Sequence, residues 1–300
     1  MSEGKERAQS RLENLEVIEP LLSSLRVLSL STMQMAMNRQ QMLDKYAARF
    51  NALATEVMRR VEVTSPIRKI AEPFDFRPVK QAQVLAVIGS TRGIVGQYNK
   101  NLARLTRQTL EKNAGEEIRV VAFGTRVHSA LRLENVEFTP HESLSAGSLP
   151  DYDSAARMIR EWSQGFEEGS LSHVKVLSYK RRGPTNNYKP VLTELLPSKM
   201  DNIVFDDDEE ESFPPPIIEG DPALIFEKIE SHFTALSFYQ LILDTVAAEN
   251  LFRFRLLEEA KENTSNLLEE LSLEVQANRR KEITQQLQEL LVGSGMLAQR

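Results

Sequence analysis

Two long stretches without glycine or proline, one near each end of the chain, most constrain what this sequence can fold into. The first contains 45 residues, from Leu21 to Ser65, and the second contains 70, from Ala223 to Val292. As α-helices they would be roughly 65 and 105 Å long, at about 1.5 Å per residue. Because a compact domain of this chain length is narrower than that, we expect both helices to extend beyond the globular part.

Apolar residues in both stretches recur at intervals of three or four, which predicts helices with an apolar seam. Around the first stretch they are Leu12, Leu15, Ile18, Leu22, Leu25 and Leu28, continued less regularly by Met33, Met37, Leu43, Phe50 and Leu53. In the second they are Leu256, Ala260, Leu267, Leu271, Val275, Ile283, Leu287 and Leu290. A partner helix must cover such a seam. Antiparallel pairing of the two stretches is therefore favoured over two separate helical domains or a homodimeric coil.

Strand and helix patterns alternate between the two predicted long helices. Strands are expected at 84–89, 117–124 and 173–180, and helices at 98–113 and 153–169. This alternation indicates a parallel sheet with right-handed crossovers. The fold class is therefore α/β, with a long antiparallel two-helix coiled coil from the two ends and an inserted Rossmann-like domain.

The segment after the sheet contains six consecutive acidic residues, 206–211, followed by three consecutive prolines. Such a composition cannot form a packed core and predicts an exposed loop. In chain order, we expect an N-terminal coiled-coil helix (1–66), the inserted α/β domain (67–200), the acidic and proline-rich loop (201–221) and a C-terminal coiled-coil helix (222–300).

Composition excludes several classes of function. The chain has no cysteine, so disulfides, thiolate metal sites and cysteine nucleophiles are absent, and its four histidines show no metal-binding spacing. No catalytic serine or kinase signature occurs. A net charge of −6 argues against a nucleic-acid partner, and no apolar run reaches eighteen residues. We expect no metal, no cofactor and no catalytic residues.

The glycine-rich turn at 89–96, GSTRGIVG, follows a buried strand as a phosphate-binding loop would. A Walker A loop needs a second glycine where Ile94 stands and a lysine after it. A dinucleotide fingerprint needs GxGxxG, and only Gly93 and Gly96 are suitably spaced. The turn fails both templates, which favours a structural turn. A nucleotide-binding α/β enzyme remains an alternative, as does a coiled-coil tether unrelated to any ATPase.

Several ordered motifs resemble the γ subunit of F-type ATP synthases. The stretch STRGIVGQYNKN is similar to that family's SDRGLCGAYN element at Ser90, Arg92, Gly93, Gly96, Tyr98 and Asn99. The segment LILDTVAAENLFRF with EEAKENT is similar to LLES-ASE-AARM and NATDNA, retaining Ala247, Glu249, Arg253, Ala260 and Asn263. The stretch from Leu271 to Leu297 is similar to LTLxYNRARQAxITQEIxEIVxGAxAL. It retains Leu271, Leu273, Arg279, Ile283, Thr284, Gln285, Glu289, Gly293 and Leu297.

The chain also departs from the family's pattern, which identifies it as a divergent member. Thr91 and Val95 replace the turn's Asp and Cys, and Gln276 and Ala277 replace an Asn-Arg pair. The first helix lacks the lysine-rich start and the KAMxMV signature.

The resemblance implies a rotor shaft without catalytic activity or cofactor, one copy per complex. The two helices would form an asymmetric shaft inside a ring of three α and three β subunits, where ATP binds and reacts. The α/β domain would lie outside that ring, near an ε-type subunit and the membrane c-ring. The complex would be peripheral, at the cytoplasmic face of the cell membrane.

The resemblance also implies site residues. Arg279, Arg280, Thr284, Gln285 and Glu289 would contact a β subunit. The domain turn, Arg92, Gly93, Gly96, Tyr98 and Asn99, would close the α/β domain against the coiled coil. Residues 290–299 carry no charge and would form a bearing. The acidic run 206–211 would face the ring or the ε-type partner, with a plain exposed loop as the alternative. Lys180, Arg181 and Arg182 would face the same partners or anionic lipid.

Overall fold

The computed structural model describes residues 2–60, 81–144, 149–183, 187–198, 219 and 221–293. The acidic run 206–211 and most of the predicted loop 201–221 lie outside the described residues, as does the end of the predicted bearing, 294–299. The chain divides into two compact units. Residues 1–29 and 253–300 form the terminal unit, and residues 30–252 form the central unit.

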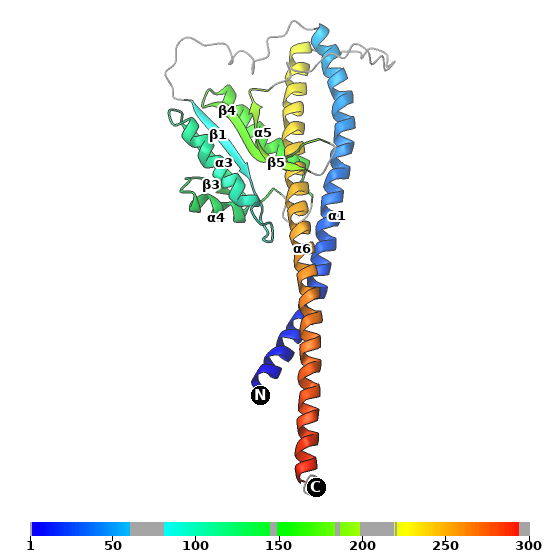
Figure 1. Ribbon diagram of the computed structural model, residues 1–300. Coiled ribbons are helices and arrows are strands. Elements are labelled where there is room, and N and C mark those ends of the chain that lie inside the picture. The colour runs from blue at the N-terminus through cyan, green and yellow to red at the C-terminus, as the bar shows by residue number, and fades with distance from the viewer. Residues whose placement is uncertain are drawn as a thin grey trace. The chain divides into compact units, whose positions relative to one another are not determined.

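Two long helices supply parts of both units. Helix α1 is Ser2–Arg60 and helix α6 is Pro222–Gly293 (Figure 1). Helix α1 continues through Pro20 without a break. One turn later, the Ser24 hydroxyl donates a hydrogen bond of 2.9 Å to the Pro20 carbonyl. Neither glycine nor proline occurs from Leu21 to the end of α1 or between Pro222 and Gly293 of α6, which explains why these stretches are not interrupted.

The two helices pair antiparallel within each unit. In the central unit Gln240 Nε2 donates to Asp44 Oδ1 at 3.1 Å, and Ala54 and Val57 pack with Ile229. Residues further along α1 therefore meet residues earlier in α6. In the terminal unit Arg26 Nη1 lies 2.6 Å from Glu258 Oε2. The predicted antiparallel two-helix pair is confirmed.

A five-stranded sheet forms the centre of the central unit (Figure 1). Its strands are β1 Ala82–Ile88, β2 Ile118–Phe123, β3 Thr139–His141, β4 Leu171–Arg181 and β5 Tyr188–Leu196. Their order is β3-β2-β1-β4-β5, with β1 to β4 parallel and β5 antiparallel to β4. The predicted parallel α/β sheet is confirmed for the first four strands.

Helices cover both faces of this sheet. Helices α3, Tyr98–Lys112, and α4, Thr125–Leu133, share a core with one face, and α5, Tyr152–Glu167, shares a core with the other. Every residue of β1 is buried, as expected for a parallel strand between two layers. Residues 235–252 of α6 contribute to both cores. The sheet is therefore attached to α6 through both of its faces.

Three elements of the central unit were not predicted. Helix α4 has only nine residues, and β3 has three. Strand β5 contains Pro190, which lacks the backbone donor that a central strand needs and marks a sheet edge. Each of these segments is too short or too irregular to show a clear period in the sequence.

The seam of the terminal unit differs from the predicted apolar stripe. On α1 the shielded positions in this unit are Ala8, Leu12, Leu15, Glu19, Leu22, Ser23, Arg26 and Ser29. Ile18, Leu25 and Leu28, which were expected in the seam, are 42%, 42% and 63% exposed. Arg26 is one of the shielded residues: it pairs with Glu258 and places its guanidinium carbon 5.9 Å from the centre of the Phe254 ring. Polar residues therefore occupy some of the shielded positions of α1, which the spacing of apolar residues alone does not predict.

The seam also ends earlier on α6 than predicted. Helix α1 has 24 residues before Arg26, whereas α6 has 35 after Glu258, so the last part of α6 has no α1 residue opposite it. Residues 279–292 are accordingly exposed on every side of the helix. Leu287, at 55% exposed, and Ile283, at 50%, do not lie in the seam, whereas Leu271 is partly buried. The expectation that Leu287 is covered by α1 is wrong.

Candidate functional site

The five residues expected to contact a β subunit all lie on the uncovered end of α6. Arg279, Arg280, Thr284, Gln285 and Glu289 are each exposed. No described residue of the chain covers this part of the helix, so every one of them is accessible to a protein that surrounds this end.

These residues do not share one face of α6. Thr284 Oγ1 donates to the Arg280 carbonyl at 2.8 Å, and Gln285 Nε2 donates to Glu289 Oε1 at 3.0 Å. The two pairs start five residues apart, which corresponds to about 140° around the helix axis. Hydrogen-bonding groups are therefore presented in two different directions.

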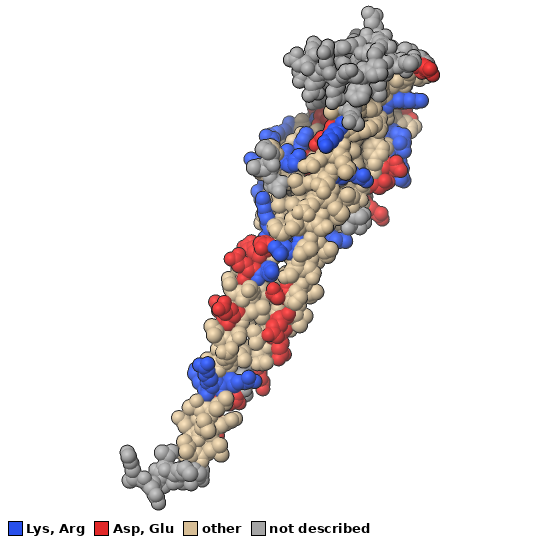
Figure 2. All heavy atoms as spheres, turned by 90° about the vertical axis from the view of Figure 1, so that its right-hand side faces the viewer, with Lys and Arg blue, Asp and Glu red and all other residues tan. Residues whose placement is uncertain are grey.

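Large apolar side chains accompany them on the same end. Ile283, Leu287, Leu290, Leu291 and Val292 are between 46% and 68% exposed. Figure 2 shows Lys and Arg side chains near this end of the molecule and then a mostly uncharged surface up to the grey residues. An exposed apolar surface of this kind is typical of a protein–protein contact.

The glycine-rich turn is held by hydrogen bonds within the chain. The Ser90 N–H donates to Asn99 Oδ1 at 3.0 Å, and Asn99 Nδ2 donates to Ser90 Oγ at 2.8 Å. The Ser90 hydroxyl donates to the Arg92 carbonyl at 3.1 Å. In a phosphate-binding loop the first N–H groups after the strand point at the ligand. Here the Ser90 N–H is already engaged by Asn99.

Close approach of two segments explains the first glycine of the turn. A Cβ added to Gly89 would lie 2.3 Å from Val127 Cβ on α4. Gly124, at the end of β2, has φ +103, and its added Cβ would lie 2.7 Å from the Gly89 carbonyl oxygen. Only glycine fits where the β1 and β2 ends meet. Gly96, which was assigned to the turn, has φ 54 and is exposed.

Tyr98 joins the turn to α6. Its ring is fully buried, stacks on Tyr179 with centroids 4.3 Å apart, and meets Phe252 of α6 edge-on at 5.6 Å. Its hydroxyl donates to the Thr245 carbonyl of α6 at 3.4 Å. Arg92 and Gly93, by contrast, lie toward the surface. Of the five predicted turn residues, Tyr98 and Asn99 thus carry the buried contacts.

A groove that the sequence did not reveal lies between α5 and the first turns of α6. It has a volume of about 450 Å³ and contains His232 and Tyr152 in its lining. One ring nitrogen of His232 lies 2.8 Å from the Tyr152 hydroxyl and the other 3.0 Å from the Tyr46 hydroxyl. Burial lowers the pKa of His232 and raises the pKa of Tyr152. A neutral His232 on α6 therefore joins α5 and α1 through the two tyrosine hydroxyls. We interpret this contact as part of the packing of the three helices and not as a catalytic site.

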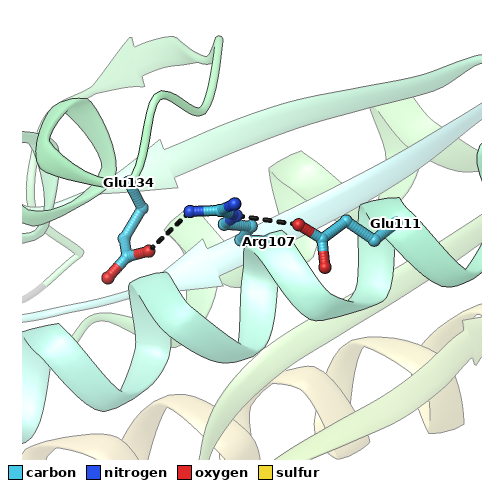
Figure 3. Close-up of polar contacts among 3 residues, drawn as sticks. All are labelled: Arg107, Glu111 and Glu134. Carbon is cyan, nitrogen blue, oxygen red and sulfur yellow. Dashed lines mark hydrogen bonds and ion pairs between the residues drawn. The ribbon is translucent and has the colours of Figure 1, made fainter.

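Surface ion pairs connect α3 to the end of α4. Arg107 Nε lies 2.8 Å from Glu111 Oε1, and Arg107 Nη1 lies 3.6 Å from Glu134 Oε2 (Figure 3). The hydrogen bond and charge of Glu111, with a smaller contribution from Glu134, raise the pKa of Arg107. All three side chains are solvent-accessible, so the pairs orient the helices more than they stabilise them.

Within the described ranges, no group of three or more acidic or histidine side chains is placed to hold a metal ion. In the same residues, no helix has the length and apolarity needed to span a bilayer. Lys180, Arg181 and Arg182 lie at the end of β4, where the first and last are exposed.

Comparison with protein families gives a match over nearly the whole chain. A family model described as ATP synthase matches residues 5–297. The ATP synthase gamma chain of Verminephrobacter eiseniae is 23% identical over 301 residues, covering 99% of each chain. That of Cupriavidus necator is 22% identical over 295 residues, covering 97% of this chain and 98% of the relative.

Solved structures show the same fold at lower identity. The chain matches a subunit in the rotor of the Euglena gracilis mitochondrial ATP synthase with a TM-score of 0.62 and 12% sequence identity. This match covers 94% of the chain and 100% of the Euglena subunit. The likeness therefore includes both the long helices and the inserted sheet.

Proposed function

The chain belongs to the family of ATP synthase γ chains, and we propose that it is the central rotor shaft of an F-type ATP synthase. It couples ion translocation through a membrane ring to ATP synthesis or hydrolysis on α and β subunits. The whole-length family match favours this function over the coiled-coil tether, which requires the motifs to be accidental. The engaged Ser90 N–H favours it over a nucleotide-binding enzyme.

The observation that carries this function is the uncovered end of α6. Residues 279–292 are exposed on all sides, and no described residue covers them. Ile283, Leu287, Leu290 and Leu291 recur at intervals that place them on one side of the helix, as in an apolar stripe that packs against another element. Because no described part of the chain covers this stripe, we infer that other subunits surround this end of α6.

A rotating shaft must not favour one orientation strongly. A preference of about 5.5 kcal/mol is enough to change a 1:99 population into 99:1, which would trap the shaft. The sequence from Leu290 to Gln299 carries no charged residue, so strong, directional ion pairs are not available there. This composition supports a bearing at the end of α6.

We assign the contacts with β subunits to the polar groups before that bearing. Arg279 and Arg280 offer guanidinium groups that bind carboxylates in a bidentate manner. Thr284, Gln285 and Glu289 are the other polar residues that we assign to these contacts. Because Arg280 and Gln285 point about 140° apart, the groups are suited to different neighbours in the ring.

The remaining parts of the chain have supporting roles in this proposal. The domain turn, with Arg92, Gly93, Gly96, Tyr98 and Asn99, closes the α/β domain on α6. Boundaries at 66, 200 and 221 separate the first helix, the inserted domain, the acidic loop and the last helix. The chain itself is not catalytic, since ATP binds and reacts on α and β. One copy would serve each complex, with an ε-type subunit and the c-ring beside the α/β domain at the cytoplasmic face of the membrane.

Co-expression with the α and β subunits of the host tests the proposal. We expect a tagged chain to co-purify with three α and three β subunits, and the complex to hydrolyse ATP while the isolated chain does not. A chain that remains alone under these conditions would contradict the rotor function.

Replacing both Arg279 and Arg280 by alanine is expected to weaken the contact between this chain and the β subunits in that complex. Loss of two charge-assisted contacts of about 1.5–3 kcal/mol each should reduce ATPase activity or assembly at least tenfold. The stability of the isolated chain should not change, because both side chains are exposed. Lys281→Ala, on the same turn, is the matched control. Equal losses of activity or assembly in both variants would contradict the assignment of β-subunit contacts to Arg279 and Arg280.

A further inference from the structure

A carboxyl group is buried where the two long helices meet the β4–β5 hairpin. Asp244 of α6 is 3% exposed, and it lies in the central unit with Gln40 of α1, 8% exposed, and Tyr188 of β5, 6% exposed. Acidic side chains are rarely this buried unless paired with a cation. The Asp244 carboxyl therefore needs an explanation in terms of its partners.

The polar groups around Asp244 leave several oxygen atoms unsatisfied. The Gln40 side chain and the Arg181 backbone hydrogen bond to the carboxyl group. Asp244 Oδ1, Gln40 Oε1 and the Tyr188 hydroxyl have no hydrogen-bond partner among the described residues. Buried polar atoms without partners are uncommon in folded proteins because each costs about 1–3 kcal/mol. Asp244 Oδ1, while the carboxyl is ionised, and Gln40 Oε1 can only accept hydrogen bonds, so a donor is missing at these two oxygens.

The charged and titratable groups facing Asp244 come from all the elements packed against it. Strand β4 contributes Lys180 and Arg181, β5 contributes Tyr188, and α1 contributes the neutral Gln40. Burial raises the pKa of Asp244, and Gln40 and the two cations oppose it. Burial, with the nearby Asp244 charge, raises the pKa of Tyr188 to about 12, so the phenol stays protonated at ordinary pH.

A proton on Asp244 would supply the missing donor. An ionised carboxylate only accepts hydrogen bonds, whereas a protonated one also donates from one oxygen. An O–H at Oδ1 is the kind of donor that Gln40 Oε1 and the Tyr188 hydroxyl, both without a partner, can accept from. Neutralisation also removes the desolvation penalty of a buried charge. We propose that Asp244, enclosed by Gln40, Tyr188 and the end of β4, is an internal proton-binding site that holds α1 and the β4–β5 hairpin on α6.

The expected consequence is a contact that loosens as the proton is released. An ionised Asp244 would draw in water or nearby cations, and the packing of β5 and α1 on α6 would weaken. The site lies where the inserted domain is attached to the long helices, so its protonation state would set how firmly the two are joined. The inference concerns the isolated chain and does not depend on the rotor function.

The direction of the pH dependence follows from the raised pKa. The unfolded chain loses its Asp244 proton near the ordinary value of 3.8, while the folded chain keeps it. The stabilisation by the neutral form is complete below that value and is lost as pH rises towards the folded-state pKa. Above the folded-state pKa the loss is constant.

Asp244→Asn tests the site because asparagine imitates the neutral acid and cannot titrate. Melting temperatures of the full chain would be measured from about pH 4 to about pH 9, using the fluorescence of the single tryptophan, Trp162. We expect the variant to gain about 2–4 °C relative to the wild type as pH rises, with little difference at the acidic end. Asp44→Asn, an exposed carboxyl on the same helix pair, should show no such growing difference.

Gln40→Leu provides a second, independent variant. It removes a hydrogen bond that favours the charged form of Asp244, so the pH-dependent loss of stability should extend to higher pH than in the wild type. Hydrogen exchange of β5 amides, corrected for intrinsic rates, should accelerate over the same pH range. A pH-independent difference between Asp244→Asn and wild type, together with an unmoved profile in Gln40→Leu, would overturn the proposal.

Discussion

Replacing Leu271 by aspartate is expected to separate α1 from α6 in the terminal unit. Leu271 is partly buried on the covered part of α6, and its replacement removes an apolar contact and introduces a charge. Glu274, three residues along the same helix, would repel that charge. We expect a local loss of about 2–3 kcal/mol, seen as an earlier loss of helical circular dichroism and faster proteolysis of α1.

Leu287→Asp is the matched control for this change. Leu287 is 55% exposed on the uncovered end, so the same chemical change should leave the stability of the isolated chain within about 0.5 kcal/mol of the wild type. Trp162, which packs on Phe238 at 5.3 Å in the central unit, should melt unchanged in both variants. Equal destabilisation by the two aspartates would show that the seam extends to Leu287 after all.

The two variants should also differ in an assembled complex. Leu271→Asp should uncouple ATP hydrolysis from ion pumping because a separated helix pair cannot transmit torque. Leu287→Asp should act instead at the contact with the surrounding subunits, by placing a charge among apolar groups. ATP-driven pumping and hydrolysis, measured together, distinguish these effects. Normal pumping by Leu271→Asp in spite of a weakened helix pair would contradict torque transmission through the pair.

Periodicity predicted the long helices but only part of their seam. Leu12, Leu15 and Leu22 lie at shielded positions of α1, as expected. Beyond them the shielded positions include Arg26 and Ser29, not the neighbouring leucines. Arg26 is shielded in a contact with Glu258, which is far from it in sequence. Apolar spacing within one helix carries no information about such a pair.

The sheet was easier to predict because its central strands are buried on both faces. Strand β1 reads as a continuous apolar run for that reason. Strand β5 is an edge strand with Pro190 and mixed exposure, so no local pattern distinguishes it from a loop. Its antiparallel pairing with β4 depends on the hairpin between them.

The candidate sites show the same contrast. The exposed residues from Arg279 to Glu289 were predicted as contacts because a family motif includes them, and not because of their chemistry. The Asp244 site was missed because Gln40, Tyr188 and Asp244 come from three elements that only the folded chain brings together. Asp244 in the sequence is one polar residue in an apolar helix segment. A buried acid in such a segment is the one local signal that could have drawn attention to it.

Gly89→Ala is expected to produce the largest loss of stability in the central unit. The added methyl group would lie 2.3 Å from Val127 Cβ and 2.7 Å from Val127 Cγ1. A Cβ atom is fixed to the backbone, so the clash can be relieved only by moving α4 away from the end of β1. Overpacking usually costs about 1–3 kcal/mol, and we expect about 3 kcal/mol here. Urea unfolding followed by Trp162 fluorescence would measure it.

A second-site change separates this steric explanation from a general effect of losing glycine. Val127→Ala removes Cγ1 and Cγ2 of Val127, the two methyl carbons that the added group would touch, and keeps its Cβ. The double variant should therefore recover part of the stability lost in Gly89→Ala. Gly115→Ala is the control, since its added Cβ meets nothing within 4 Å, and it should be neutral. If Gly89→Ala were as stable as Gly115→Ala, the contact between the turn and α4 would be looser than 2.3 Å implies. The glycine would then have to be explained by the turn's backbone alone.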